Sequence, residues 1–132
     1  MKLSVVIPAY NAARHIDAVL ERVAALVTSG LRHVIVVDDG SRDDTAQRVA
    51  RFQPDGFRVT LLKRPQNGGY GAAMKDGLAA ARADAPDLVA CIHADGQYAP
   101  EALPGLIRAL SVRGLDLLQG SRIAGGAALE GG

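Results

Sequence analysis

The chain has 132 residues, of which 48% are hydrophobic and 4% aromatic, and its formal net charge at pH 7 is +1. This length predicts a single domain with its own core. The near-neutral charge gives no reason to expect nucleic acid or an anionic membrane surface as a partner, and the lack of Trp argues against a base-stacking surface for single strands.

The first residues show no signal-peptide pattern, and the chain has no apolar run of about 20 residues that would cross a bilayer. We therefore expect a cytoplasmic protein.

Cys91 is the one cysteine, so no internal disulfide is possible. Because Cys91 lies in an apolar run, we expect an inert core thiol.

Short apolar runs alternate with stretches of helical periodicity. We expect strands at 3–7, 34–37, 59–62, 88–92 and 115–118, and helices at 16–27, 43–52, 72–83 and from residue 100 onward. Asn11 and Ser41 are predicted to cap the helices that follow them, and Gly30 to end the first helix. The alternation predicts an α/β fold with a Rossmann-like, mostly parallel sheet and helices on both faces.

The glycine content rises from residue 120, and the stretch 123–132 has no apolar periodicity. We therefore expect residues 1–122 to form the α/β domain and residues 123–132 to form a tail or the start of a further part.

The segment that follows the predicted strand 88–92 carries polar side chains suited to a metal. Asp95 and Gln97 offer two hard oxygen donors at the carboxyl end of a strand, where open α/β sheets bind ligands. Such donors suit Mg²⁺ or Mn²⁺. His93 is close enough in sequence to contact the same site. The alternative is that Asp95 lies in a turn and Gln97 on the surface.

Two other strand ends carry candidate binding residues. Pro8, Ala9 and Tyr10 follow the first strand and can hold a flat base, although a plain turn explains them as well. Asp38 and Asp39 follow the second strand. Adjacent carboxylates repel each other unless something binds them, and a carboxylate can accept from a base N–H or a ribose hydroxyl. Solvated turn acids are the alternative.

The remaining candidates are a glycine-rich loop and an arginine. Gly71 lies in the run 67–71, whose glycines allow backbone N–H groups to approach an anion at a helix N-terminus; a flexible turn explains it equally well. Arg122 follows the last predicted strand, and its guanidinium can pair with phosphate oxygens. An exposed surface arginine is the alternative.

Five segments, in order, together resemble family 2 glycosyltransferases with a GT-A fold, in particular the dolichyl- or polyprenyl-phosphate sugar synthases. They are SVVIPAYN (4–11), VVDDGSRDDT (36–45), NGGYGAA (67–73), ADGQY (94–98) and GSR (120–122). The resemblance covers essentially the whole chain, as the nucleotide-binding half of such an enzyme.

The resemblance implies roles for individual residues. Asp39, with Asp38 beside it, would bind the nucleotide, and Pro8, Ala9 and Tyr10 would line the base pocket. Asp95 and Gln97 would hold Mg²⁺ or Mn²⁺ on the diphosphate, which makes Asp95 the expected catalytic residue. Arg122 would face the phosphates.

Three departures from the family pattern stand out. His93 replaces the first metal-site Asp, and imidazole is a poor ligand for Mg²⁺. Ala12 replaces a Glu that commonly follows the first strand tip. The chain also stops where the acceptor-binding half is expected to begin.

We therefore expect an inverting glycosyltransferase with a nucleotide-diphosphate sugar donor, linked to UDP or GDP. A polyprenyl phosphate at the membrane surface is the expected acceptor, which would place the protein peripheral to the membrane face. The alternative is a stand-alone nucleotide-binding module without transferase activity. An open sheet edge left by a shortened domain would favour self-association.

Overall fold

The structure is a computed structural model that describes residues 2–94 and the strand residues 117–119. Its elements, in chain order, are β1 (Leu3–Ala9), α1 (Ile16–Ala24), the 3-10 helix η1 (Ala25–Ser29), β2 (Leu31–Asp38), α2 (Thr45–Arg51), β3 (Arg58–Lys63), α3 (Tyr70–Arg82), β4 (Leu88–Cys91) and β5 (Leu117–Gln119).

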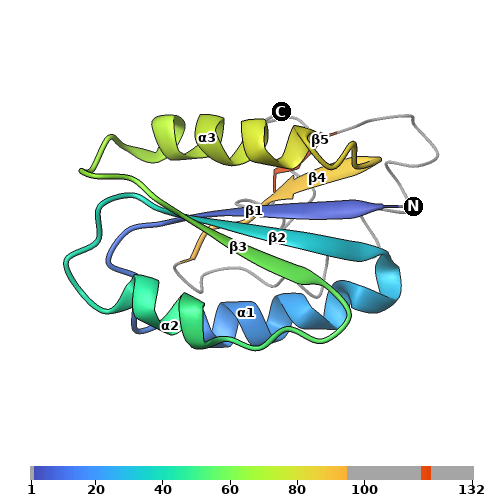
Figure 1. The fold of residues 1–132 in the computed structure, drawn as a ribbon, viewed down its shortest axis with the longest axis horizontal. Helices are drawn as coiled ribbons and strands as arrows, with labels where there is room; N and C mark the ends of the chain where they lie inside the picture. The colour runs from blue at the N-terminus through green and yellow to red at the C-terminus, as the bar shows by residue number, and fades with distance from the viewer. Residues whose placement is uncertain (1, 95–116, 120–132) are drawn as a thin grey trace, which may run out of the picture.

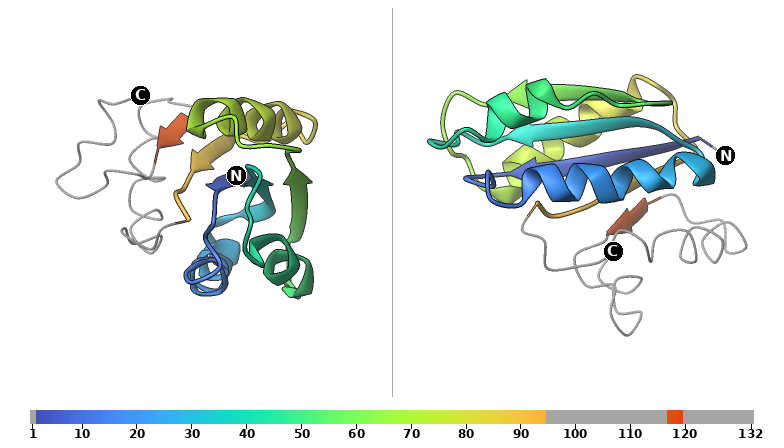
Figure 2. Two further views of the ribbon diagram at one scale, coloured as in Figure 1. Left: turned by 90° about the vertical axis from the view of Figure 1, so that its left-hand side faces the viewer. Right: turned by 90° about the horizontal axis from the view of Figure 1, so that it is seen from below.

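The strands form one sheet in the order β3-β2-β1-β4-β5, and every neighbouring pair is parallel. Helices α1 and α2 cover one face and α3 covers the other (Figures 1 and 2). The chain adds β2 and β3 on one side of β1, and α3 then returns it to β4 on the other side. The predicted α/β fold is confirmed, and the strand order reverses between β1 and β4, where such sheets bind ligands.

All seven residues of β1 are buried, because both faces of the sheet are covered. Val5 and Ile7 belong to the core cluster that includes α1, whereas Val6 belongs to the cluster under α3. Full burial of an aliphatic side chain of this size contributes about 1.5–3 kcal/mol. The sequence of β1 is therefore a continuous apolar run interrupted only by Ser4, which is also buried.

Helix α3 approaches the sheet closely at Gly77. A Cβ atom there would lie 2.3 Å from Cγ1 of Val6 and 3.1 Å from Cγ2 of Val37. The buried residues of α3 are consequently small: Ala73, Gly77 and Ala81. Met74 and Leu78, on the same helix, are only partly buried.

Strand β2 begins at Leu31 rather than at residue 34, and this changes the position of a histidine. His33 therefore lies within the strand and is only 6% exposed. Gly30 has a φ of 102° and ends η1 in the left-handed conformation, as predicted.

The helix predicted from residue 100 lies outside the described residues. Among the helices that are described, none is long and apolar enough to cross a membrane.

Candidate functional site

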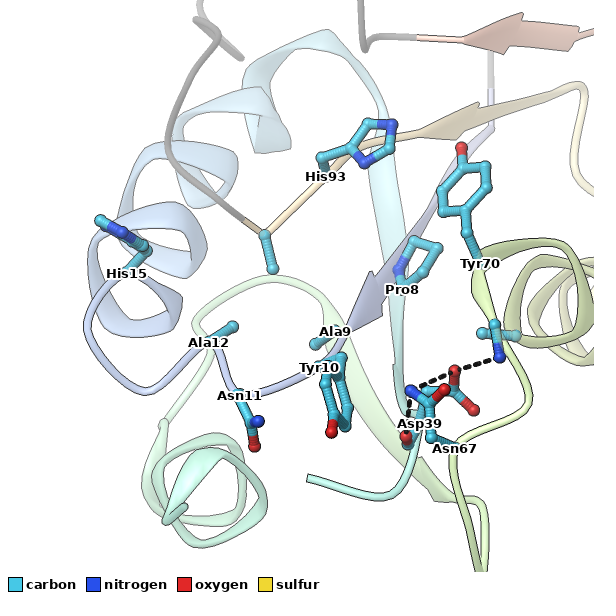
Figure 3. Close-up of a pocket in the computed structure, with 13 residues that line it drawn as sticks. Pro8, Ala9, Tyr10, Asn11, Ala12, His15, Asp39, Asn67, Tyr70 and His93 are labelled. Atoms are coloured by element: carbon cyan, nitrogen blue, oxygen red, sulfur yellow. Dashed lines mark hydrogen bonds between the residues drawn. The ribbon is translucent and has the colours of Figure 1, made fainter. Parts of the chain in front are cut away.

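A cavity of about 330 Å³ lies at the carboxyl ends of β1 and β2, where the order of the sheet reverses. It is drawn in Figure 3. Its lining comes from four segments of the chain: Pro8, Ala9, Tyr10, Asn11, Ala12 and His15; Asp39; Asn67, Gly69, Tyr70 and Ala73; and His93 and Ala94.

The wall that follows β1 is held in place by the loop that follows β2. Ser41 Oγ accepts from the Asn11 N–H at 2.8 Å, and Asn11 Oδ1 accepts from the Arg42 N–H at 2.8 Å. The Ala12 N–H donates to Thr45 Oγ1 at 2.9 Å. These bonds fix the backbone on the far side of Tyr10, whose ring is 48% exposed and stands in the cavity wall (Figure 3).

The two predicted helix caps are wrong. Helix α1 begins at Ile16 with His15 at the N-cap, and α2 has Asp44 at the N-cap. Asn11 and Ser41 bond to each other's loops instead, because those loops lie side by side at the carboxyl edge of the sheet.

Asp39 is the most highly bonded side chain among the lining residues. Its Oδ1 accepts from Arg64 Nε at 2.8 Å and from the Gly68 N–H at 2.9 Å. Its Oδ2 accepts from the Gly69 N–H at 2.8 Å and from Asn67 Nδ2 at 3.2 Å. Asp39 is 3% exposed, and its carboxylate joins the end of β2 to the start of α3. Figure 3 shows it beside Asn67.

The close approach of these two loops requires a glycine at residue 40. Gly40 has a φ of +76°, and a Cβ there would lie 2.6 Å from the backbone nitrogen of Asn67. A side chain at this position would separate the loops and pull Asn67 away from Asp39.

Asp38 is not among the lining residues of the cavity. Its Oδ1 accepts from the Ser41 N–H at 3.0 Å, and the residue is 4% exposed. The two adjacent carboxylates therefore have separate partners within the chain. The repulsion inferred from the sequence needs no ligand to relieve it.

The opposite wall carries two stacked rings. Tyr70, the first residue of α3, lies with its ring centroid 4.7 Å from that of His93 and with the ring planes 7° apart. The stacking fixes the orientation of the imidazole at the carboxyl end of β4. No group of three or more His, Cys, Asp or Glu side chains placed to hold a metal occurs within residues 2–94. His93 is the predicted ligand that lies in this part of the chain.

The structure thus brings Pro8, Ala9, Tyr10, Asp39 and His93 to the lining of one cavity. Gly71 lies in the first turn of α3 but not among the lining residues, whereas Gly69 does line the cavity. Asp95, Gln97 and Arg122 lie outside the described residues, as does the boundary predicted near residue 122.

Sequence reasoning did not assign Asn67, Tyr70 or His15 to the site. Asn67 and Tyr70 belong to the motif 67–71, which was interpreted through its glycines alone. The amide of Asn67 and the aromatic ring of Tyr70, which stand beside these glycines, are the features of the sequence that indicate a binding role. His15 had no signal, because only the fold brings the start of α1 to the cavity.

The thiol of Cys91 is buried next to this site but does not contribute to its chemistry. It is 1% exposed, and burial raises the pKa of the thiol to about 11. The expectation of an inert core thiol agrees with this burial.

Comparison with known proteins places this fold and cavity in a family. The sequence profile of Glycosyl transferase family 2 matches residues 4–129. The chain is 34% identical over 125 residues to the dodecaprenyl-phosphate galacturonate synthase of Rhizobium johnstonii, covering 92% of this chain and 36% of that protein. It is 35% identical over 125 residues to the polyprenol monophosphomannose synthase of Mycolicibacterium smegmatis, covering 92% of this chain and 45% of that protein.

Two solved structures have a similar fold. Glucosyl-3-phosphoglycerate synthase from Mycobacterium tuberculosis, in complex with Mn²⁺, UDP and glucosyl-3-phosphoglycerate, matches with a TM-score of 0.64 and 32% identity over 83% of this chain and 39% of that chain. The mannosyltransferase PcManGT from Pyrobaculum calidifontis, in complex with GDP-Man and Mn²⁺, matches with a TM-score of 0.68 and 25% identity over 83% of this chain and 32% of that chain.

The chain spans less than half the length of each of these proteins. Within that span the parallel sheet and the profile match agree with the five motifs that follow the strands. The chain belongs to glycosyltransferase family 2 and has part of a GT-A fold.

Proposed function

We propose that this chain is the donor-binding part of an inverting glycosyltransferase that uses a nucleotide-diphosphate sugar. The observation that carries the proposal is the cavity at the reversal of the sheet, where Asp39, Asn67 and the segment Pro8–Tyr10 meet. Related structures that contain UDP or GDP-Man support the proposal.

The pair Asp39 and Asn67 suits a base that carries an N–H beside a carbonyl. Four donors of the chain already bond to the Asp39 carboxylate. The longest of these bonds comes from the Asn67 amide, which lies 3.2 Å from the carboxylate and 3.2 Å from the Asp39 backbone carbonyl. A base N–H would take the place of this amide at Oδ2, and the amide would then donate to the neighbouring base carbonyl. Uracil and guanine both present that edge, whereas cytosine and adenine do not.

The walls of the cavity suit the flat ring of the base. Tyr10 and Pro8 offer an aromatic and an aliphatic surface, and the bonds of Asn11 and Ala12 to the β2–α2 loop hold this wall in place. Because these bonds are made within the chain, this wall is held in place independently of the base.

The diphosphate would lie toward the segment that follows β4. His93 would be joined there by Asp95 and Gln97 as metal ligands, and Mn²⁺ is favoured over Mg²⁺ because imidazole is a borderline ligand. A metal held by these residues would supply positive charge to the diphosphate. Arg122 and the N–H groups near Gly71 would supply further positive potential to the phosphates.

A polyprenyl phosphate is the proposed acceptor, because the names of two relatives of this chain refer to polyprenyl phosphates or to their sugar derivatives. A phosphate acceptor is already anionic at neutral pH, so its attack on the anomeric carbon requires no strong general base. A single displacement of the nucleoside diphosphate inverts that carbon. The protein would then work in the cytoplasm at the membrane face.

The experiment is a calorimetric titration of UDP and of GDP into the chain, with and without Mn²⁺. We expect Mn²⁺-dependent binding of one nucleotide, lost in Asp95→Ala and retained in Asp55→Ala, which makes the same substitution in an exposed turn. CDP and ADP should bind at least tenfold more weakly if Asp39 and Asn67 recognise the base. Failure of the folded chain to bind either nucleotide would contradict the proposal.

A second function is a nucleotide-binding module without transferase activity, which is favoured by His93 at the position of the first metal-site Asp. Transfer or hydrolysis of a nucleotide sugar by these 132 residues would exclude it. Light scattering on the same preparation tests the predicted self-association, since a monomer at high concentration would contradict an open pairing edge.

A further inference from the structure

A second cavity, of about 440 Å³, lies at the amino-terminal edge of the sheet, opposite the edge that carries the candidate donor site. The starts of β1, β2 and β3 and the turn after α3 surround it. Its polar lining residues are Lys2, Ser4, Arg32, His33, Arg58 and Asp84.

Positive charge exceeds negative charge in this lining. Asp84, the one carboxylate among the described residues of the lining, accepts from Arg58 at 2.7 Å and is bonded to His33. Lys2 Nζ donates to the Asp84 backbone carbonyl at 2.7 Å, and Arg32 donates to the Leu31 carbonyl at 3.0 Å. Because these carbonyls are neutral acceptors, the bonds leave two lining cations without a bonded carboxylate.

A second acid lies near this edge without entering the cavity lining. The Asp87 carboxylate accepts from the backbone N–H of Lys2 at 2.7 Å and does not line the cavity. Within the part of the chain that the structure describes, the lining therefore has three cationic side chains and one carboxylate, which favours an anion.

The interior of the cavity offers a hydroxyl in a rigid frame. Ser4 is only 1% exposed and lines the cavity. Beside it, His33 is bonded through Nε2 to Thr60 Oγ1 at 2.6 Å and through Nδ1 to Asp84. These bonds tie β2, β3 and the turn after α3 together, so the hydroxyl lies in a site that is already formed.

We propose that this cavity binds a small phosphate-bearing anion. Arg32 and Lys2 pair with the phosphate oxygens at the rim, and the Ser4 hydroxyl donates from within. Phosphate suits this set because it presents several acceptor oxygens and, near neutral pH, up to two negative charges, and a guanidinium can bond two of its oxygens at once. The volume lies within the range of small-molecule sites and leaves room for an organic group on the phosphate.

The site is separate from the proposed donor site and does not depend on the proposed function. Its lining residues come from the starts of the strands, whereas those of the donor cavity follow the strand ends. Loss of one activity would therefore leave the other measurable.

The test is a titration of the ¹⁵N-labelled chain with inorganic phosphate, followed by amide NMR shifts. We expect saturable shifts at Ser4, Arg32 and His33. Arg32→Gln should weaken binding by about tenfold, the effect of one charge-assisted contact. The matched control is Arg51→Gln, the same change of charge beside Asp17 and Glu21 on another surface, and it should leave the affinity unchanged.

A further variant, Ser4→Ala, tests whether phosphate binds through specific contacts or only through attraction to the positive charges. Ser4→Ala keeps every charge and should weaken phosphate binding several-fold while the thermal midpoint without phosphate stays near that of the wild type. Equal affinity in Ser4→Ala and wild type, equal weakening in the two arginine variants, or shifts confined to Gly69 and Tyr70 would each overturn the proposal.

Discussion

The carboxylate of Asp39 is expected to be a major determinant of stability as well as of binding. Asp39→Asn keeps the shape of the side chain but removes its charge and turns an NH₂ group toward donors. Two of the four present donors, from the exposed residues Asn67 and Gly68, can be satisfied by water instead. The Gly69 N–H and the Arg64 guanidinium, which is 23% exposed, have less access to solvent.

The magnitude follows from these two donors. Leaving a buried donor unsatisfied costs about 1–3 kcal/mol, and breaking a buried charge pair costs about 3–5 kcal/mol. Arg64 retains its pair with Asp76, which reduces the second cost. We therefore expect Asp39→Asn to lower the free energy of unfolding by about 3 kcal/mol, a large part of the total for a domain of this size.

Urea unfolding followed by circular dichroism measures this change. With a slope of about 1–3 kcal/mol per molar, the midpoint should fall by about 1–3 M while the slope stays constant. The control is Asp76→Asn, which removes the other partner of Arg64 at a side chain that is 50% exposed, and it should cost less than about 1 kcal/mol. Equal effects of the two variants would refute the reasoning.

Three further predictions concern packing, reactivity and pH. Gly77→Ala should destabilise the fold by about 1–3 kcal/mol in thermal unfolding, because its Cβ meets Val6, whereas Gly71→Ala, where a Cβ meets nothing within 4 Å, should be neutral or stabilising. Cys91 should not react with a thiol reagent at pH 8 until the chain unfolds, since burial raises its pKa to about 11; rapid labelling of the native chain would contradict this. The His33 hydrogen bond holds the pKa of Asp84 below its usual value, so this stabilisation is complete above about pH 5 and is lost as the pH falls through the lowered pKa. Acid titration of Asp84→Asn should show a shallower loss of stability below pH ~4 than wild type, and identical acid curves would be inconsistent with this assignment.

The motifs of the sequence predicted the architecture and part of the site because both depend on local patterns. Continuous apolar runs indicate strands buried on both faces, and alternation with helices indicates parallel pairing. In a parallel sheet the residues after each strand meet at one edge. Pro8 and Asp39 could therefore be assigned to one site although they are 31 positions apart (39 − 8).

Contacts between side chains from different segments could not be predicted in this way. The sequence indicated that Asp38 and Asp39 required partners, but not that Ser41 would bond to Asp38 and that the loop 64–69 would bond to Asp39. Nor did any spacing indicate that His33 would join Thr60 and Asp84.

The sequence by itself determined which segments are strands, that they are parallel, and which residues follow them at the ligand-binding edge. Only the tertiary structure decided how the carboxylates are paired, that Tyr70 stacks on His93, and that a cationic cavity forms at the opposite edge. The physical reason is that periodicity records whether each residue faces the core. The partner of a polar side chain depends instead on which distant loop the crossover helices bring beside it.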